Sequence, residues 1–208
     1  NKRANFGGAW VFPGGKIEMS DGHPELHNYS QGISDQVASN ILGIESGGLD
    51  FWIACIRECF EESGILLAYK SSGELLGRPT SSEEKILNNY REELNNGETV
   101  LIEMCKELNL TLAVDQLAYI SHWVTPETEL KRYSTRFFIA IAPRGQKGVH
   151  DGSESVESLW IEPTDALRDG ESGRLPMLLP TKRNLEAIVG FKNTEELFQK
   201  KVSEQHEV

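Results

Sequence analysis

The stretch that decides the fold is ACIRECFEESG, residues 54–64. Its apolar residues and those just before it recur at helical spacing, and Gly64 is a natural stop signal, which predicts a helix over about residues 49 to 62. The apolar residues are Ile53, Ile56 and Phe60. The same two turns also carry a guanidinium and three carboxylates, namely Arg57, Glu58, Glu61 and Glu62.

The three glutamates lie together on one side of the predicted helix. At about 100° per residue they span a wedge of about 100° beside the apolar face. Carboxylates this close repel each other, so the arrangement is costly unless a cation sits among them. Carboxylate oxygens in this number suit Mg²⁺ or Mn²⁺ better than zinc. A solvated acidic helix face is the alternative interpretation, and Arg57 weighs against it because a guanidinium can fix a glutamate through paired hydrogen bonds.

A second segment, FPGGKIE at residues 12–18, precedes the helix. Two glycines after a proline allow the backbone to approach another group closely and leave a carbonyl available as a ligand. Alone, such a segment is usually only a turn. Combined with the glutamate-rich helix, it indicates a binding loop.

Composition limits the classes of partner. The net charge is −11 and there is no basic block, which argues against a nucleic acid as partner. The apolar runs are too short for a membrane span, so no membrane partner is expected. An acidic protein that handles phosphates needs cations, and a metal ion is the obvious supply.

The predicted elements alternate between strands and helices. Strands are expected at 65–69, 117–124 and 134–142, with short strands at 7–15 and near 158–161. One helix is expected from a Ser81/Glu84 capping box to about residue 96. Further helices are expected at 98–108, from Pro163 to Arg168, and in the tail. Residues 19–48 are polar and are predicted to be a surface insertion without regular elements. This order favours an α/β fold with a mixed sheet between helices.

Together the two segments resemble the Nudix hydrolases. The box of that family reads G, five residues, E, seven residues, then R-E-U-x-E-E-x-G-U, where U is a bulky aliphatic residue. Here Gly15 opens the box and residues 57–65, RECFEESGI, close it. The gap between them is about 28 residues longer than usual, and Cys59 replaces an aliphatic residue. The acidic partner of Arg57 stays open, with Asp50 and Glu45 as the nearest carboxylates considered.

A split box of this kind resembles one branch of the family, the coenzyme A diphosphatases. HWVTP at 122–126 and RYSTRFFIA at 132–140 are similar to strands of that branch. The resemblance implies a Nudix α/β/α sandwich formed by one domain over residues 1–208, with insertions at about 16–48 and 70–112. The first strand of such a domain precedes residue 7, so this chain is expected to lack it.

The resemblance also implies roles for single residues. The carbonyl of Gly14 and the carboxylates of three glutamates would bind the metal, while Arg57 orients them. Lys16 would contact a substrate phosphate, and Glu154, six residues before Trp160, would be the general base or a further metal ligand. Glu157 is the other carboxylate of that segment, and a solvated position for both is the alternative. Apart from the resemblance, Arg136 on its predicted strand is a candidate for contact with a 3′-phosphate, with a surface ion pair as the alternative. The three metal-binding glutamates are Glu58, Glu61 and Glu62.

The implied function is Mg²⁺-dependent hydrolysis of a nucleoside diphosphate linked to another group, with Mn²⁺ as a substitute metal. Coenzyme A or an acyl-coenzyme A is the first expected substrate. An ADP-ribose or ADP-sugar diphosphatase and a non-catalytic nucleotide sensor are the alternatives. A small-molecule nucleotide is the expected partner, a homodimer is left open, and the C-terminal SEQHEV favours a cytoplasmic protein because it lacks a peroxisomal ending.

Overall fold

A computed structural model describes residues 8–150, 152 and 157–206 of the chain. It divides into two compact units, which are described one by one. The first, called here the box unit, comprises the described residues within 13–117 and 140–158. The second, called the tail unit, comprises the described residues within 8–12, 118–139 and 159–206.

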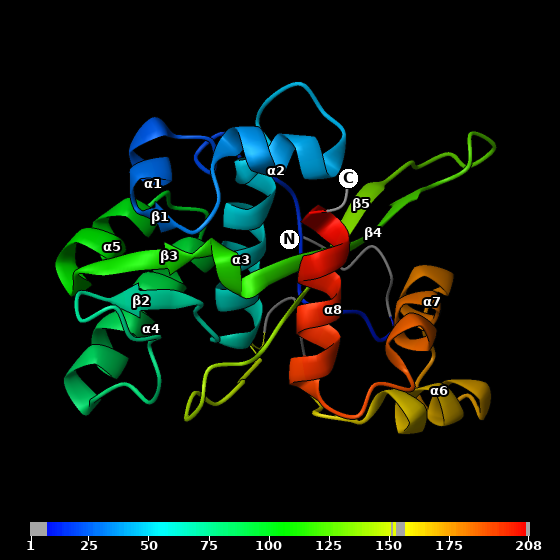
Figure 1. The fold of residues 1–208 in the computed structure, drawn as a ribbon. Coiled ribbons are helices and arrows are strands. Elements are labelled where there is room, and N and C mark those ends of the chain that lie inside the picture. Colours follow the sequence, from blue (N-terminus) through cyan, green and yellow to red (C-terminus); the bar gives the residue numbers. More distant parts are fainter. Residues whose placement is uncertain (1–7, 151, 153–156, 207–208) are drawn as a thin grey trace. The chain divides into compact units, whose positions relative to one another are not determined.

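The box unit contains a small mixed sheet with helices around it (Figure 1). Its strands have the order β1-β3-β2; β1 is parallel to β3 and β2 is antiparallel to it, with Ser30 and Ala68 both paired with Leu112. The elements are α1 (Pro24–Asn28), β1 (Ser30–Gln31), α2 (Asp35–Leu42), α3 (Leu49–Ser63), β2 (Ala68–Lys70), α4 (Ser81–Asn95), α5 (Leu101–Leu108), β3 (Leu110–Ala113) and the 3₁₀ turn η1 (Val114–Gln116).

Helix α3 is the central element of this unit and confirms the helix predicted from the opening stretch. It packs against α2, α4 and η1. Its apolar face is fully buried, and Trp52 donates a 3.3 Å hydrogen bond from Nε1 to the carbonyl of Leu117. The helix ends at Gly64, whose φ of 72° lies in the left-handed region that glycine adopts without strain. Burial of this face fixes which side of α3 presents the glutamates.

The tail unit contains a two-stranded sheet and three helices. These elements are β4 (Leu117–Val124, whose first residue belongs to the box unit), β5 (Ser134–Ala140), α6 (Pro163–Glu171), α7 (Leu179–Ile188) and α8 (Thr194–His206). Aromatic side chains pack within the unit: the ring centroids of Tyr119 and Phe138 are 5.7 Å apart. The side chain of Gln205 on α8 accepts a hydrogen bond from the backbone of Tyr119. The predicted strands at 117–124 and 134–142 are confirmed.

Four local predictions were wrong. Residues 19–48 form α1, β1 and α2, and β1 is held by pairing with β3, a strand that was not expected at all. The capping box of α4 lies one residue earlier, at Thr80 and Glu83. Residues 158–161 form no strand, and residues 8–15 contribute only one bridge, between Trp10 and Met177.

In the part of the chain that the structure describes, no helix combines the length and apolar character needed to cross a membrane.

Candidate active site

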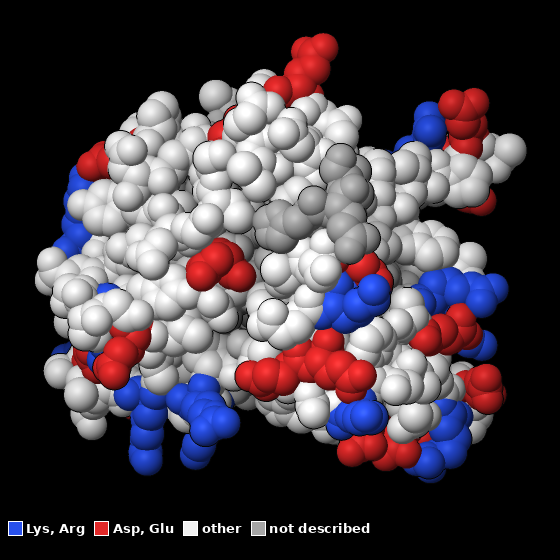
Figure 2. Space-filling view, in the orientation of Figure 1, with Lys and Arg blue, Asp and Glu red and all other residues white. Residues whose placement is uncertain are grey.

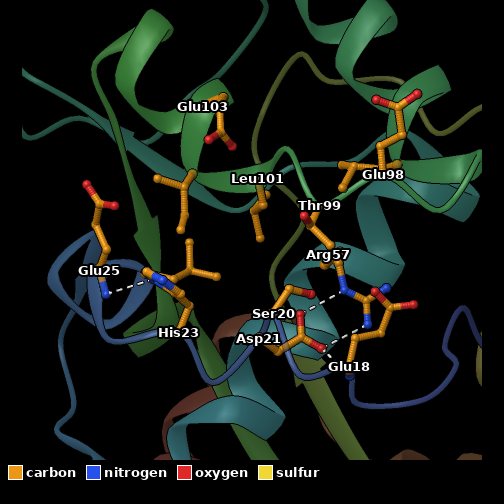
Figure 3. Close-up of a pocket in the computed structure, with 13 residues that line it drawn as sticks. Glu18, Ser20, Asp21, His23, Glu25, Arg57, Glu98, Thr99, Leu101 and Glu103 are labelled. Atoms are coloured by element: carbon orange, nitrogen blue, oxygen red, sulfur yellow. Dashed lines mark hydrogen bonds and ion pairs between the residues drawn. The ribbon is translucent and has the colours of Figure 1, made fainter.

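Arg57 is the centre of the candidate site. Its Nε and Nη2 donate to the two carboxylate oxygens of Asp21 at 2.8 and 3.0 Å, a bidentate pair in which the side chains are only 4% and 1% exposed (Figure 3). Nη1 donates to Glu58 at 3.0 Å and to Glu61 at 2.9 Å, and Nη2 also donates to the carbonyl of Lys16 at 2.8 Å. Since a guanidinium has five N–H groups, these five bonds use all of them.

Asp21 is the functional residue that the sequence analysis missed. The carboxylates considered then lie elsewhere: Asp50 pairs with His27 at 3.0 Å, and Glu45 is exposed. The signal was present, because Asp21 follows Gly15 after five intervening residues, which is the acidic position of the box. The insertion follows Asp21 rather than preceding it, so spacing counted back from Arg57 does not reach this residue.

The electrostatics of the pair follow from burial and contact. Burial alone would lower the pKa of Arg57, but the hydrogen bonds and charges of Asp21, Glu61 and Glu58 outweigh it and raise that pKa. Burial also raises the pKa of Glu61; Arg57 opposes this increase, whereas the charges of Glu58 and Glu18 add to it. The carboxylates are therefore crowded enough for folding to disfavour the ionised form of Glu61.

The glycine loop lies against the same helix end. The amide of Gly14 donates to the carboxylate of Glu62 at 3.2 Å. A side chain at Gly15 would meet the carboxylate of Glu58, so glycine lets the loop lie against this carboxylate without displacing it. The structure thus brings Gly14, Glu58 and Glu62 to the same end of α3 as Arg57.

The donor set suits a hard cation. Three carboxylates and the nearby glycine backbone supply oxygen ligands of the kind that Mg²⁺ prefers. In the conformation described, Glu58 and Glu61 both accept from Nη1 of Arg57, and no three acidic, histidine or cysteine side chains among the described residues converge as a metal site. Each of these carboxylates accepts from Arg57 through one oxygen, so its second oxygen would be the one to bind a metal, while Asp21 holds Arg57 in place.

The other predicted site residues are placed as follows. Lys16 has an exposed side chain and joins the network through its carbonyl. Arg136 lies on β5 in the tail unit. The partial burial of His122 lowers the pKa of this histidine, and the charge of Arg136 lowers it further. Glu154 lies outside the described residues. Glu157, its alternative in the same segment, is exposed.

A cavity of about 240 Å³ borders the Arg57–Asp21 pair (Figure 3). Its polar walls are acidic, since carboxylates come from the loop before α1, from α1 itself and from the α4–α5 region; they are Glu18, Glu25, Glu98 and Glu103. A diphosphate would be repelled by such walls. The cavity is therefore a poor place for an anionic substrate, and we place the chemistry on the glycine-loop side of Arg57.

On the described surface of the tail unit, basic side chains lie beside acidic ones. In the tail unit, Figure 2 shows the basic side chains of α6 and α7 interleaved with acidic ones. Arg168 pairs with Asp165 at 2.7 Å, and Arg183 with Glu186 at 2.8 Å.

This fold and site are those of the Nudix hydrolase class. The sequence model of the NUDT19 Nudix domain matches residues 34–185, so the chain belongs to the NUDT19 Nudix domain family. It is 29% identical over 219 residues to acyl-coenzyme A diphosphatase NUDT19 of Xenopus laevis, covering 91% of this chain and 57% of the relative. The same-named protein of Gallus gallus is 25% identical over 164 residues, covering 73% and 43%.

A solved structure supports the fold. The Nudix hydrolase from Alicyclobacillus acidocaldarius superposes with a TM-score of 0.71 at 25% identity, covering 92% of this chain and 81% of that one. The predicted Nudix family, its NUDT19-like branch and the α/β fold with a mixed sheet are confirmed. The chain spans about half the length of the curated relatives it matches, 57% and 43%.

The buried pair gives a first prediction. Asp21→Asn should lower the free energy of unfolding by about 3 kcal/mol, because it leaves a buried guanidinium without its main counter-charge while changing little volume. The matched control is Asp50→Asn. Its partner is a histidine and its side chain is 24% exposed, so the loss there should be below about 1 kcal/mol. Urea unfolding measures both, and equal losses would contradict the assignment of Asp21 as the partner of Arg57.

Proposed function

We propose that this chain is a Mg²⁺-dependent diphosphatase that hydrolyses coenzyme A or an acyl-coenzyme A. The observation that carries the proposal is the network at the end of α3. Asp21 fixes Arg57, Arg57 holds Glu58 and Glu61, and the Gly14–Gly15 loop lies against Glu58 and Glu62. A non-catalytic sensor would not need a cluster of carboxylates that repel each other.

The residues that would hold the metal are Glu58, Glu61, Glu62 and the carbonyl of Gly14. When bound there, Mg²⁺ supplies charge neutralisation for the diphosphate oxygens. Arg57 keeps two of the carboxylates close to their working positions, which lowers the reorganisation needed on binding. Water attacks one phosphorus, the bridging P–O bond breaks, and a carboxylate accepts the proton of the water.

Glu154 is our candidate for that proton acceptor. The segment before it is tied to the end of α3, because the amide of Val149 donates to the carbonyl of Ser63 at 2.7 Å. Five residues of chain can span at most about 18 Å. A carboxylate at position 154 is therefore within reach of the metal-binding glutamates.

The substrate is proposed from the relatives together with this chemistry. Both named relatives are acyl-coenzyme A diphosphatases, and the family is the same. Cleavage of coenzyme A at its diphosphate would give 3′,5′-ADP and phosphopantetheine. Lys16 and Arg136 are our candidates for contacts to the phosphates, with Arg136 assigned to the 3′-phosphate.

A substrate panel tests the proposal. The protein is incubated with Mg²⁺ and coenzyme A, an acyl-coenzyme A, dephospho-coenzyme A or ADP-ribose, and products are identified by mass. We expect 3′,5′-ADP from coenzyme A. Dephospho-coenzyme A differs only by lacking the 3′-phosphate assigned to Arg136, so its cleavage should be slower. Turnover of ADP-ribose about tenfold faster than any coenzyme A would favour the ADP-sugar alternative. Binding of these compounds without cleavage would favour a sensor.

A further inference from the structure

The C-terminal end of α3 has carbonyl groups that the helix itself cannot satisfy. The last carbonyls of any α-helix lack an intrahelical partner. Here those carbonyls belong to Glu61, Glu62 and Ser63, so two of them come from residues that carry proposed metal ligands. The last turn contains no basic residue, and the negative end of the helix dipole disfavours carboxylates placed there.

Arg91 of α4 bonds two of these carbonyls. Nε of Arg91 donates to the carbonyl of Glu61 at 2.9 Å, and Nη2 donates to the carbonyl of Glu62 at 2.9 Å. The guanidinium lies over the glycine cap, since a side chain at Gly64 would come within 3.0 Å of Nη1. Arg91 thus places a positive charge where the dipole and the two glutamates are most negative.

Arg91 also connects this helix end to the segment that leads to the proposed base. Its Nη2 donates to the carbonyl of Val149 at 2.7 Å, and the amide of Val149 donates to Ser63 at 2.7 Å. The same segment is anchored further back by Gln146, whose amide bonds with both backbone groups of Leu66 at 2.9 Å. The segment 144–150 is therefore held at two points, to the end of α3 through Val149 and to Leu66, just beyond the helix, through Gln146.

We propose that Arg91 is a positioning residue for the diphosphatase site. It fixes the backbone of Glu61 and Glu62, and it ties the segment 144–150 to the same helix end. One planar guanidinium bonds three carbonyls from two segments, which the single ammonium group of a lysine cannot reproduce in the same geometry. The proposal rests on the proposed function, because it assigns Arg91 a role in holding the ligands of that site.

The test uses Arg91→Gln and Arg91→Lys in the full chain. Binding of Mn²⁺ without substrate, measured by electron paramagnetic resonance, should weaken by about 10- to 100-fold in both variants, as is typical when a group that orients metal ligands is lost. Hydrogen exchange at 144–150 should become faster, because the segment loses one of its anchors. In Arg91→Ala, guanidinium at non-denaturing millimolar concentrations should restore part of the Mn²⁺ affinity.

Two neighbours on α4 are matched controls. Tyr90→Phe removes a hydrogen bond to Glu107 and leaves the end of α3 untouched, so Mn²⁺ affinity should not change. Asn95→Ala removes one longer bond of 3.3 Å to the carbonyl of Glu61, so its effect should be smaller than that of Arg91→Gln. Unchanged Mn²⁺ affinity and unchanged exchange in Arg91→Gln would overturn the proposal. Absence of Mn²⁺ binding and of diphosphatase activity in the unaltered protein would instead overturn the proposed function.

Discussion

Glu61→Gln should lower kcat by at least about a hundredfold while leaving the fold intact. The change removes one ligand charge and almost no volume. Loss of a group that only orients a metal ligand typically lowers metal affinity or activity about 10- to 100-fold. Loss of a ligand itself should therefore lower activity more. Steady-state hydrolysis at saturating Mg²⁺ measures the effect, together with the Mg²⁺ concentration needed for half-maximal rate, which should rise.

The stability of the same variant separates this role from a structural one. Burial and the charges of Glu58 and Glu18 raise the pKa of Glu61, so folding disfavours its ionised form. Without metal near neutral pH, Glu61→Gln should therefore be no less stable than the unaltered protein. As the pH falls below the raised pKa, Glu61 itself becomes protonated and any advantage of the variant should disappear. Glu98→Gln, in the acidic cavity, is the control for activity and should turn over normally; near-normal turnover of Glu61→Gln would remove Glu61 from the metal site.

Glu154→Gln should lower kcat by about 10²- to 10⁴-fold if Glu154 accepts the proton of the attacking water, since that is the usual worth of a general base. KM should change little, because binding of the diphosphate does not need the proton acceptor. Glu157→Gln is the matched control, since Glu157 belongs to the same segment and is exposed. A large loss in the Glu157 variant with normal turnover in the Glu154 variant would show that the wrong carboxylate was assigned.

The centre of the site could be predicted because one helix carries most of it. The spacing of Ile53, Ile56 and Phe60 determines which face of α3 is buried, and that face determines where the glutamates point. The strand at Leu117–Val124 could be predicted equally well from its own sequence. Both elements are long, and their patterns are local.

The missed features depend on contacts between distant segments. β1 has only two residues, Ser30 and Gln31, and exists because β3 lies beside it, so no local pattern identifies it. The pair of Asp21 and Arg57 joins positions 36 residues apart, across an insertion of unpredictable length. Arg91 looks like any charged residue on a polar helix, and its three carbonyl partners become visible only in the folded chain.

The central claim is that the end of α3 is a metal site for diphosphate hydrolysis. The most direct measurement is product mass from coenzyme A in ¹⁸O-labelled water, with Mg²⁺ and with EDTA, for the unaltered protein and Glu61→Gln. We expect 3′,5′-ADP and phosphopantetheine, with one ¹⁸O in one of the two products, from the unaltered protein with Mg²⁺, none with EDTA, and at least about a hundredfold slower formation in Glu61→Gln. Cleavage that continues in EDTA, or that proceeds equally well in Glu61→Gln, would contradict the claim.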